Sequence, residues 1–342
     1  MLIRTATTLA SLVLLLFALG CEKESESITS IALHPTNTNI LYVATNDAVY
    51  KTRDGGGSWE RFPSFSARRV TTVALDPQLP ATVYAGTMGD AVYKSPDGGQ
   101  HWLPHNVGLK EHVSFINQFV FHPTHSEVIY AATTVGAFIT KDAGREWEER
   151  MNGMKEVHIV VSAAINPQNP KILYAGTTGG VYRTDDGASS WKKINNGLIP
   201  EKELMGAMAL GVNVLVLDPV TPDIVYAGTT KGLFRTANGG TSWERIGQSL
   251  PDPFVSSMVI DPLQPAKLYI GGPAGVWTSA DGGQSWQAIN HGLTSLNIRS
   301  LAMSPKHSQE LFVGTNGSGL YHSTDAGATW TPMPLKAAPA QK

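Results

Sequence analysis

One eight-residue motif ending in tryptophan recurs seven times along the chain. Each copy reads Ser/Thr-x-Asp/Asn-Gly/Ala-Gly/Ala-x-x-Trp, and the copies end at Trp59, Trp102, Trp147, Trp191, Trp243, Trp286 and Trp330. Successive tryptophans are separated by 43, 45, 44, 52, 43 and 44 residues. A period in the forties, with strand-like sequence between the copies, is typical of a β-propeller with one blade per repeat.

Each repeat carries four short strand signals. The first strand is followed by a proline, as in Leu33-His-Pro35, because proline has no N–H to give to the ladder. The second strand is an apolar run such as Val83–Thr87, the third ends at the Ser/Thr of the motif, and the tryptophan opens the fourth. The sequence therefore predicts an all-β fold, a seven-bladed β-propeller with four antiparallel strands per blade. Because the chain starts in an inner strand and ends in an outer one, we expect no strand to be shared between the first and last blades.

The motif itself has the chemistry of a structural turn. Its Ser/Thr and Asp side chains accept hydrogen bonds from nearby backbone N–H groups, glycine supplies a positive φ, and tryptophan buries a large apolar surface. A catalytic carboxylate repeated around a ring would not mark one site, so we interpret the third motif position as structural. Its seven occupants are Asp54, Asp97, Asp142, Asp186, Asn238, Asp281 and Asp325. Two copies depart from the pattern, with Asn238 in place of aspartate and Ala188 in place of the second glycine.

The motif resembles the Asp-box of the BNR-repeat proteins, and the resemblance covers residues 28 to 334. That superfamily includes sialidases, xyloglucan-cleaving glycosidases, sortilin-type receptor ectodomains and photosystem II assembly factors of the Ycf48 kind. A single seven-bladed propeller behind a lipoprotein signal is most similar to the Ycf48-like group, whose role is the assembly of a membrane complex. The resemblance implies the architecture and very little chemistry, since a fold does not determine function.

The N-terminus has the pattern of a lipoprotein signal. One basic residue, Arg4, precedes the apolar run Leu9–Leu19, and the chain's single cysteine follows Gly20. We expect residues 1–20 to be a signal peptide, Cys21 to be lipidated, residues 21–27 to be a tether, residues 28–334 to be the propeller and residues 335–342 to be a flexible tail. The alternative is an ordinary cleaved signal with an incidental cysteine. Lipidation places the protein in the bacterial cell envelope, periplasm-facing or on the outer surface.

Cysteine content and charge exclude several classes of function. The chain has one cysteine, which excludes disulfides, thiol catalysis and covalently attached c-type haem. The whole chain has a formal charge of −2, and removal of Arg4 with the signal leaves 25 basic against 28 acidic residues. So neutral a surface argues against nucleic acid as a partner.

Binding is expected at the mouth of the ring opposite the Asp-box turns, where the inter-blade loops lie. The candidates on this rim are basic, polar or aromatic: Arg68, Arg69, His105, Lys110, His112, Phe115, His158, Phe254, Asn297 and Arg299. Arg299 is notable because its counterparts in the other blades are Thr29, Thr71, Asn117, Val161, Asn213 and Ser256. We expect a solvated side chain there, with an anion site as the alternative.

The longest inter-blade connection is residues 195–211, which accounts for the 52-residue spacing. It carries Leu204, Met205 and Met208, a methionine-rich surface suited to contact with another protein. The alternative is a loop that caps its own blade.

No catalytic or metal site is predicted. The mouth loops offer Asp90, Glu111, Glu156, Glu201, Glu203 and Asp252, but no pair of them matches the two carboxylates that a glycosidase needs. The histidines are scattered without metal-ligand spacing, and no cofactor is expected. The sequence therefore predicts a non-catalytic, membrane-anchored protein-binding or assembly scaffold whose partner is a membrane protein or complex. The alternative is a glycan-binding or glycoside-hydrolase-like propeller of the sialidase or xyloglucanase type, which would use the same mouth.

Overall fold

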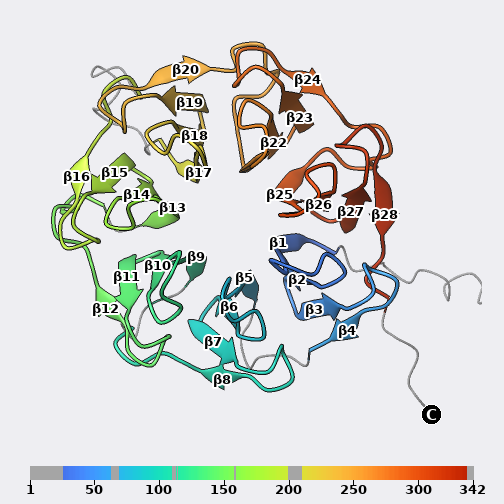
Figure 1. Cartoon of the computed structure of the whole chain (residues 1–342), viewed down its shortest axis with the longest axis horizontal. Coiled ribbons are helices and arrows are strands. Elements are labelled where there is room, and N and C mark those ends of the chain that lie inside the picture. Colours follow the sequence, from blue (N-terminus) through green and yellow to red (C-terminus); the bar gives the residue numbers. More distant parts are fainter. Residues whose placement is uncertain are drawn as a thin grey trace, which may run out of the picture.

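The computed structural model describes residues 26–62, 69–109, 113, 115–157, 159–198 and 210–336. These residues form 28 strands in seven four-stranded antiparallel sheets, which stand as blades around a central channel (Figure 1). The predicted fold class is confirmed. Within this part of the chain, no helix is long and apolar enough to cross a membrane.

The strands follow one another in order from the channel to the perimeter in every blade (Figure 1). The first blade consists of β1 (Ile28–Leu33), β2 (Leu41–Thr45), β3 (Val49–Thr52) and β4 (Glu60–Arg61). The second consists of β5 (Val70–Leu75), β6 (Val83–Thr87), β7 (Val92–Ser95) and β8 (Leu103–Pro104). The third consists of β9 (Ile116–Phe121), β10 (Ile129–Thr133), β11 (Gly136–Thr140) and β12 (Glu148–Glu149).

The other four blades repeat the pattern with strands of similar length. They consist of β13 (Val160–Ile165), β14 (Leu173–Thr177), β15 (Gly180–Thr184) and β16 (Lys192–Lys193), then β17 (Val212–Leu217), β18 (Val225–Thr229), β19 (Gly232–Thr236) and β20 (Glu244–Ile246), then β21 (Ser257–Ile260), β22 (Leu268–Gly272), β23 (Gly275–Ser279) and β24 (Gln287–Ala288), then β25 (Ile298–Met303), β26 (Leu311–Thr315), β27 (Leu320–Ser323) and β28 (Thr331–Met333).

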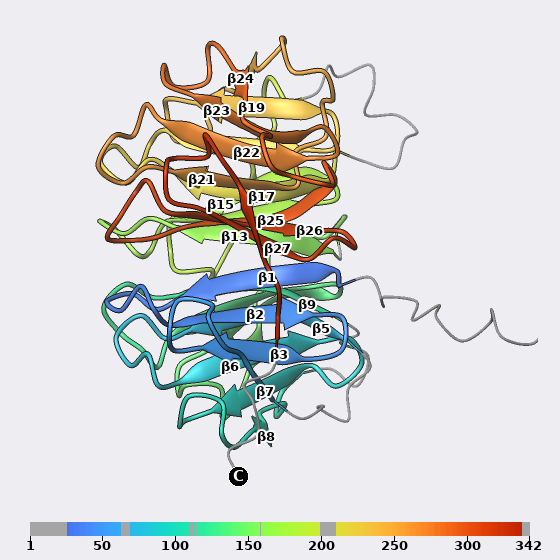
Figure 2. The ribbon, with the colours of Figure 1, turned by 90° about the vertical axis from the view of Figure 1, so that its right-hand side faces the viewer.

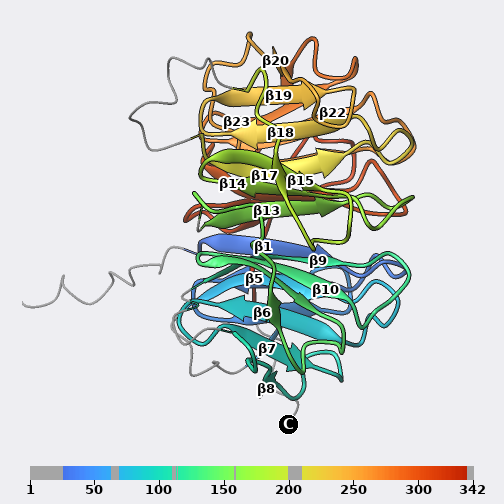
Figure 3. The same cartoon turned by 90° about the vertical axis from the view of Figure 1, so that its left-hand side faces the viewer.

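The strands run between two faces of the ring, which Figures 2 and 3 show edge-on. One face carries the Asp-box turns and the loops from first to second strands, which are tied together by bonds such as Gly55 N–H to Asn39 O at 3.0 Å. We name it the box face. The opposite face carries the turns from second to third strands and the linkers that lead into the next blade, and we name it the linker face.

The apolar core lies between neighbouring blades. One cluster joins Tyr42, Val49 and Phe62 of the first blade to Val70 and Val83 of the second. Burial of both sheet faces in this way is the reason that the second strands read as continuous apolar runs.

Each Asp-box is a turn held by its own side chains. Thr52 Oγ1 donates to Asp54 Oδ1 at 2.7 Å, and the N–H groups of Gly56 and Ser58 donate to Thr52 Oγ1 and Asp54 Oδ1, both at 2.9 Å. Hydrogen bonds from the Ser58 side chain, the Thr52 side chain and the Ser58 N–H hold the pKa of Asp54 well below its usual range. Asn238 accepts the same two bonds in the fifth blade, at 2.8 and 3.0 Å from Thr236 Oγ1 and Ser242 N.

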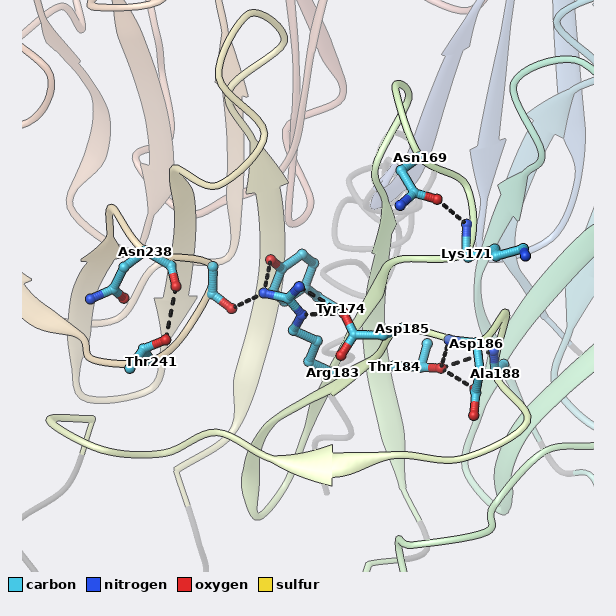
Figure 4. Close-up of polar contacts among 11 residues, drawn as sticks. Asn169, Lys171, Tyr174, Arg183, Thr184, Asp185, Asp186, Ala188, Asn238 and Thr241 are labelled. Carbon is cyan, nitrogen blue, oxygen red and sulfur yellow. Dashed lines mark hydrogen bonds and ion pairs between the residues drawn. The ribbon is translucent and has the colours of Figure 1, made fainter.

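The Asp-box also docks on the preceding blade. Arg183 of the fourth blade donates to the carbonyl of Gly239 in the fifth blade's box at 2.7 Å, beside Tyr174 (Figure 4). Lys94 and the Tyr84 hydroxyl reach the carbonyl of Ala143 in the third blade's box in the same way, at 2.9 and 3.0 Å. The motif therefore builds its own turn and holds the neighbouring blade.

The second glycine of the box leaves room for an apolar side chain of the preceding blade. At Gly240, where φ is +92°, an added Cβ would lie 2.2 Å from Ile194 Cδ1. The fourth blade tolerates Ala188 because the residue at the position of Ile194 in the preceding blade is Arg150, whose guanidinium turns to Glu148. The methyl group of Ala188 is fully buried there.

A second repeated element, Asn-x-Gly-Leu, follows several fourth strands and was not predicted. Asn195 accepts from Val181 N–H and donates to Gly179 O, both at 2.8 Å, so it clamps the turn of its own blade. Gly197 then passes so close to the next blade that a Cβ would lie 2.1 Å from Trp243 O. The N–H of Trp243 donates to Asn196 O at 2.8 Å and its Nε1 to Ile194 O at 2.7 Å.

The ring closes without a shared strand, as predicted: β1–β4 and β25–β28 are separate sheets. The prediction of a flexible tail from residue 335 is wrong for its first two residues. Leu335 is buried against Trp59, and Lys336 O accepts from Trp59 N–H at 3.0 Å, as inter-blade linkers do elsewhere. Trp59 Nε1 has no hydrogen-bond partner among the described residues, so this seam has one inter-blade bond fewer than the junction at Trp243.

We expect G240A to lower the free energy of unfolding by about 1–3 kcal/mol, because the new methyl group overpacks against Ile194. Chemical denaturation checks this, and I194A in the same chain should recover part of the loss. The matched control is G89A, where φ is +105° and nothing lies within 4 Å of the added Cβ. Equal losses in G240A and G89A would show that backbone strain alone is responsible.

The seam should open when its docked tail is weakened. L335D places a charge in a buried site and should cost about 2–4 kcal/mol, the range for loss of a buried leucine. Hydrogen exchange should then rise first in β1 and β25. L103D, at an exposed leucine, is the control; unchanged exchange at the seam in L335D would contradict the docking role.

Lys51 should make stability depend on pH. Burial lowers its pKa from 10.5 to about 8, while its Nζ donates to Gly98 O at 2.7 Å. Because the unfolded state then binds the proton more tightly, stability should rise as pH increases from about 8 to 10.5. K51M should remove that rise in denaturation curves, whereas K306M, at an exposed lysine, should keep it. If the stability of K51M still rises over this pH range, the rise comes from other titratable groups.

Candidate binding site at the linker face

The linker-face mouth of the channel is built by a bulge near the start of the inner strands. In β1 the register shifts between Ile28 and Ser30, so Thr29 has no partner on β2. The same shift occurs in β5, β9, β13, β17 and β25. A bulge re-aims the side chain of the unpaired residue, which here turns toward the next blade.

These side chains form a belt of hydrogen bonds around the mouth. Four of these residues, and Ser256 just before β21, each donate to a backbone carbonyl at or just before the start of the next inner strand: Thr29 to Val70 at 3.0 Å, Thr71 to Ile116 at 2.5 Å, Asn117 to Val160 at 2.7 Å, Asn213 to Val255 at 2.9 Å and Ser256 to Ile298 at 2.7 Å. In the fourth blade the unpaired residue is Val161, and the neighbouring Ser162 donates to Val212 O at 3.1 Å instead. Six of the seven junctions are therefore closed by a short neutral side chain.

Arg299 occupies the seventh junction, between the last blade and the first. Its Nη1 lies 3.1 Å from Ser27 Oγ and 3.5 Å from Asn316 Oδ1. The guanidinium carries five N–H donors, and these two contacts share one nitrogen. The Arg299 side chain is exposed, and the cation stands where the other junctions have hydroxyl, amide or aliphatic groups.

A hollow of about 440 Å³ opens at the mouth beside Arg299. Asn117, Asn213 and Ser256 of the belt line it, together with Asn297, Asn316 and the partly exposed ring of Phe254. Phe254 is held in place because its N–H donates to Asp252 Oδ1 at 2.8 Å and its carbonyl passes over Gly272, where a Cβ would lie 2.4 Å away. The hollow thus combines one cation, several amides and one aromatic edge.

Apart from His105, the predicted contact residues divide into three groups. Phe254, Asn297 and Arg299 come together at the hollow. Arg69 and Phe115 lie on the linker face beside the second and third blades, where their carbonyls accept from Met88 and Thr134 N–H, but they do not line the hollow. Outside the described residues lie Arg68, Lys110, His112, His158, Leu204, Met205 and Met208.

The prediction for His105 is wrong. It directly follows β8, and its Nδ1 is 3.1 Å from Gly144 O of the next Asp-box. Burial lowers the pKa of this imidazole. Sequence alone suggested a rim position because the residue follows the fourth strand, but the inter-blade linker begins only after it.

The residue before each strand-ending proline was missed as a structural position. His34 Nδ1 accepts from the N–H groups of Thr36 and Asn37 at 3.2 and 3.1 Å, and Asp76 Oδ1 does the same for Gln78 and Leu79. The recurring pattern of His, Asp or Asn before proline is the signal that could have identified these caps.

Within the described ranges, no group of three or more His, Cys, Asp or Glu residues is placed to hold a metal ion. The seven box tryptophans are buried or half-buried, and the eighth, Trp277, is half-buried in β23 with its Nε1 donating to Ala274 O at 3.2 Å. The described part of the mouth therefore presents no exposed tryptophan on which a sugar ring could stack.

Comparison with known proteins identifies the family. The Sortilin-Vps10 model, described as sortilin, neurotensin receptor 3, matches residues 47–169 and 274–342, together more than half of the chain. The chain belongs to the Sortilin-Vps10 family. Among curated protein sequences, none matches it.

Solved structures of several other proteins share the fold of this propeller. The GH74 xyloglucanase from Xanthomonas campestris is 17% identical with a TM-score of 0.64 over 92% of this chain, which spans only 61% of the xyloglucanase. YCF48 bound to a D1 peptide is 18% identical with a TM-score of 0.62 over 88% of this chain and 94% of YCF48. YCF48 from Cyanidioschyzon merolae is 14% identical with a TM-score of 0.62 over 88% of this chain and 96% of its own. At these identities the likeness establishes the fold alone.

Proposed function

We propose that this Sortilin-Vps10 family chain is a non-catalytic binding module, anchored to a membrane through Cys21, whose linker-face mouth holds a segment of a partner protein. The hollow beside Arg299 carries the proposal. It interrupts the neutral belt with a single cation and adds an aromatic edge from Phe254. An extended polypeptide that bears a carboxylate, from an acidic side chain or a C-terminus, fits this combination because a guanidinium binds carboxylates in a two-point geometry.

The likeness to YCF48 bound to a D1 peptide supports a peptide as the ligand. That ring is nearly the same size as this one, since 94% of it is covered. A segment that enters the hollow would meet amide groups of Asn117, Asn213 and Asn297, which pair with a peptide backbone irrespective of its sequence. Arg299 and Phe254 would then contribute the selectivity.

A glycan ligand or a glycosidase activity is the alternative, favoured by the likeness to the GH74 xyloglucanase. Such sites use aromatic platforms beside a pair of carboxylates. In the described part of this mouth, the residues that line the hollow include Phe254 but no carboxylate and no tryptophan. The chemistry of the hollow thus supports protein recognition over glycoside cleavage.

Photo-crosslinking tests the proposal in native membranes. A benzoylphenylalanine at position 297 of the full-length chain should crosslink to one protein partner. R299Q should strongly reduce the crosslink by removing the charge while leaving a donor for Ser27, and R299K should retain part of it. K306Q, which removes an exposed cation from the box face, should leave the crosslink unchanged.

Thermal melting of the variants separates binding from folding, because Arg299 also lies at the seam. A crosslink of equal yield in wild-type and correctly folded R299Q protein would contradict the role of Arg299. Absence of any protein crosslink, together with retention of the chain on a polysaccharide column, would replace the proposal with the glycan alternative.

A further inference from the structure

The chain enters the ring at a fixed point on the linker face. Glu26 O accepts from Gly319 N–H at 3.0 Å, and Ser27 pairs with Asn316 as an isolated bridge. Ser27 is buried, its Oγ donates to Asn316 Oδ1 at 3.0 Å, and it also contacts Arg299. The turn between β26 and β27 therefore holds these two residues, and the position of the ring relative to anything attached upstream is set at Glu26.

Cys21 lies five residues before this point. Fully extended chain advances at most about 3.5 Å per residue, so the connection from Cys21 to Glu26 spans no more than about 17 Å. The inner strands have six residues in most blades, which gives the ring a thickness of about 20 Å before its loops are counted. A chain that starts on the linker face is thus too short to reach past the box face.

We infer that the anchored ring holds its linker face toward the membrane, and that the hollow beside Arg299 receives an extramembrane loop or terminus of a protein embedded in the same membrane. This inference rests on the proposed lipidation of Cys21 and on the proposed role of the hollow. A short tether of this kind restricts the partner, because the gap between the mouth and the bilayer admits an extended segment and excludes a separate folded domain. The box face is turned to the aqueous compartment.

Energy transfer to lipid headgroups measures this orientation without any partner. Cys21 is the only cysteine, and its thiol is consumed by lipidation, so one added cysteine carries the only label. K155C and K171C form a matched pair, because both replace exposed lysines next to the fourth blade. Lys155 lies in the linker that leads into β13 on the linker face, whereas Lys171 lies in the loop from β13 to β14 on the box face and backs onto the fourth Asp-box (Figure 4).

Full-length donor-labelled proteins would be reconstituted into vesicles of phosphatidylethanolamine and phosphatidylglycerol with rhodamine-labelled phosphatidylethanolamine as acceptor. Transfer should be higher from K155C than from K171C. An insertion of about 20 Gly/Ser residues between Glu24 and Ser25 should abolish the difference, since a flexible linker of that length spans about 25 Å on average. Equal transfer from the two labels with the native tether, or higher transfer from K171C, would overturn the inference.

The remaining outcomes distinguish this inference from its premises. If full-length protein does not float with the vesicles, or C21S protein floats equally well, the anchor is absent and the inference fails with it. If the orientation is observed but position 297 crosslinks to a soluble protein, the membrane-protein partner is wrong while the geometry stands. If the orientation is observed and R299Q leaves the crosslink intact, only the role of Arg299 in the proposed function fails.

Discussion

The contact between each Asp-box and the blade before it is the interaction on which the ring depends. The side chains inside the box fix a turn with two successive residues at positive φ. Once formed, that turn presents a carbonyl to Tyr and Lys or Arg side chains of the preceding blade, a glycine surface to an apolar side chain and a tryptophan to the linker. The same eight residues therefore fix a local backbone conformation and hold one blade to the next.

Repetition of this contact explains why the ring closes without a shared strand. The seam uses the same elements as the other junctions, since Met333 packs under Gly56 and Lys336 accepts from Trp59 N–H. Each junction between blades is held by a similar set of packing contacts and hydrogen bonds, so no junction needs an additional stabilising element. The seam differs in Arg299, which replaces a short neutral side chain in the belt. The least regular chemistry of the mouth is thus found where the two ends of the chain meet.

The architecture could be predicted from the sequence because it is determined by local sequence signals that recur seven times. Proline, small residues and the Asp-box each act within a few residues of their own position, so their spacing reveals strand order and blade number. Contacts between repeats are different. His105 docks on Gly144 and Leu335 on Trp59, and each of these pairs joins two separate blades. Arg299 could be singled out by comparing repeats, but its neighbours Asn316 and Phe254 could be assigned to the same hollow only in the folded ring.

Symmetry also limits where function can reside. A residue that occurs in every blade is required by every blade, and its substitution affects the scaffold before it affects a ligand. Residues that do not recur in every blade are not required by the scaffold in this way. In the described part of the mouth, these residues are Arg299, Phe254 and the asparagines around the hollow. The solved structures of YCF48 and of the xyloglucanase share the propeller fold with this chain, and a shared fold does not determine which ligand is bound. Glu26 lies on the same face as the hollow, so the chain enters the ring on the side where the hollow opens.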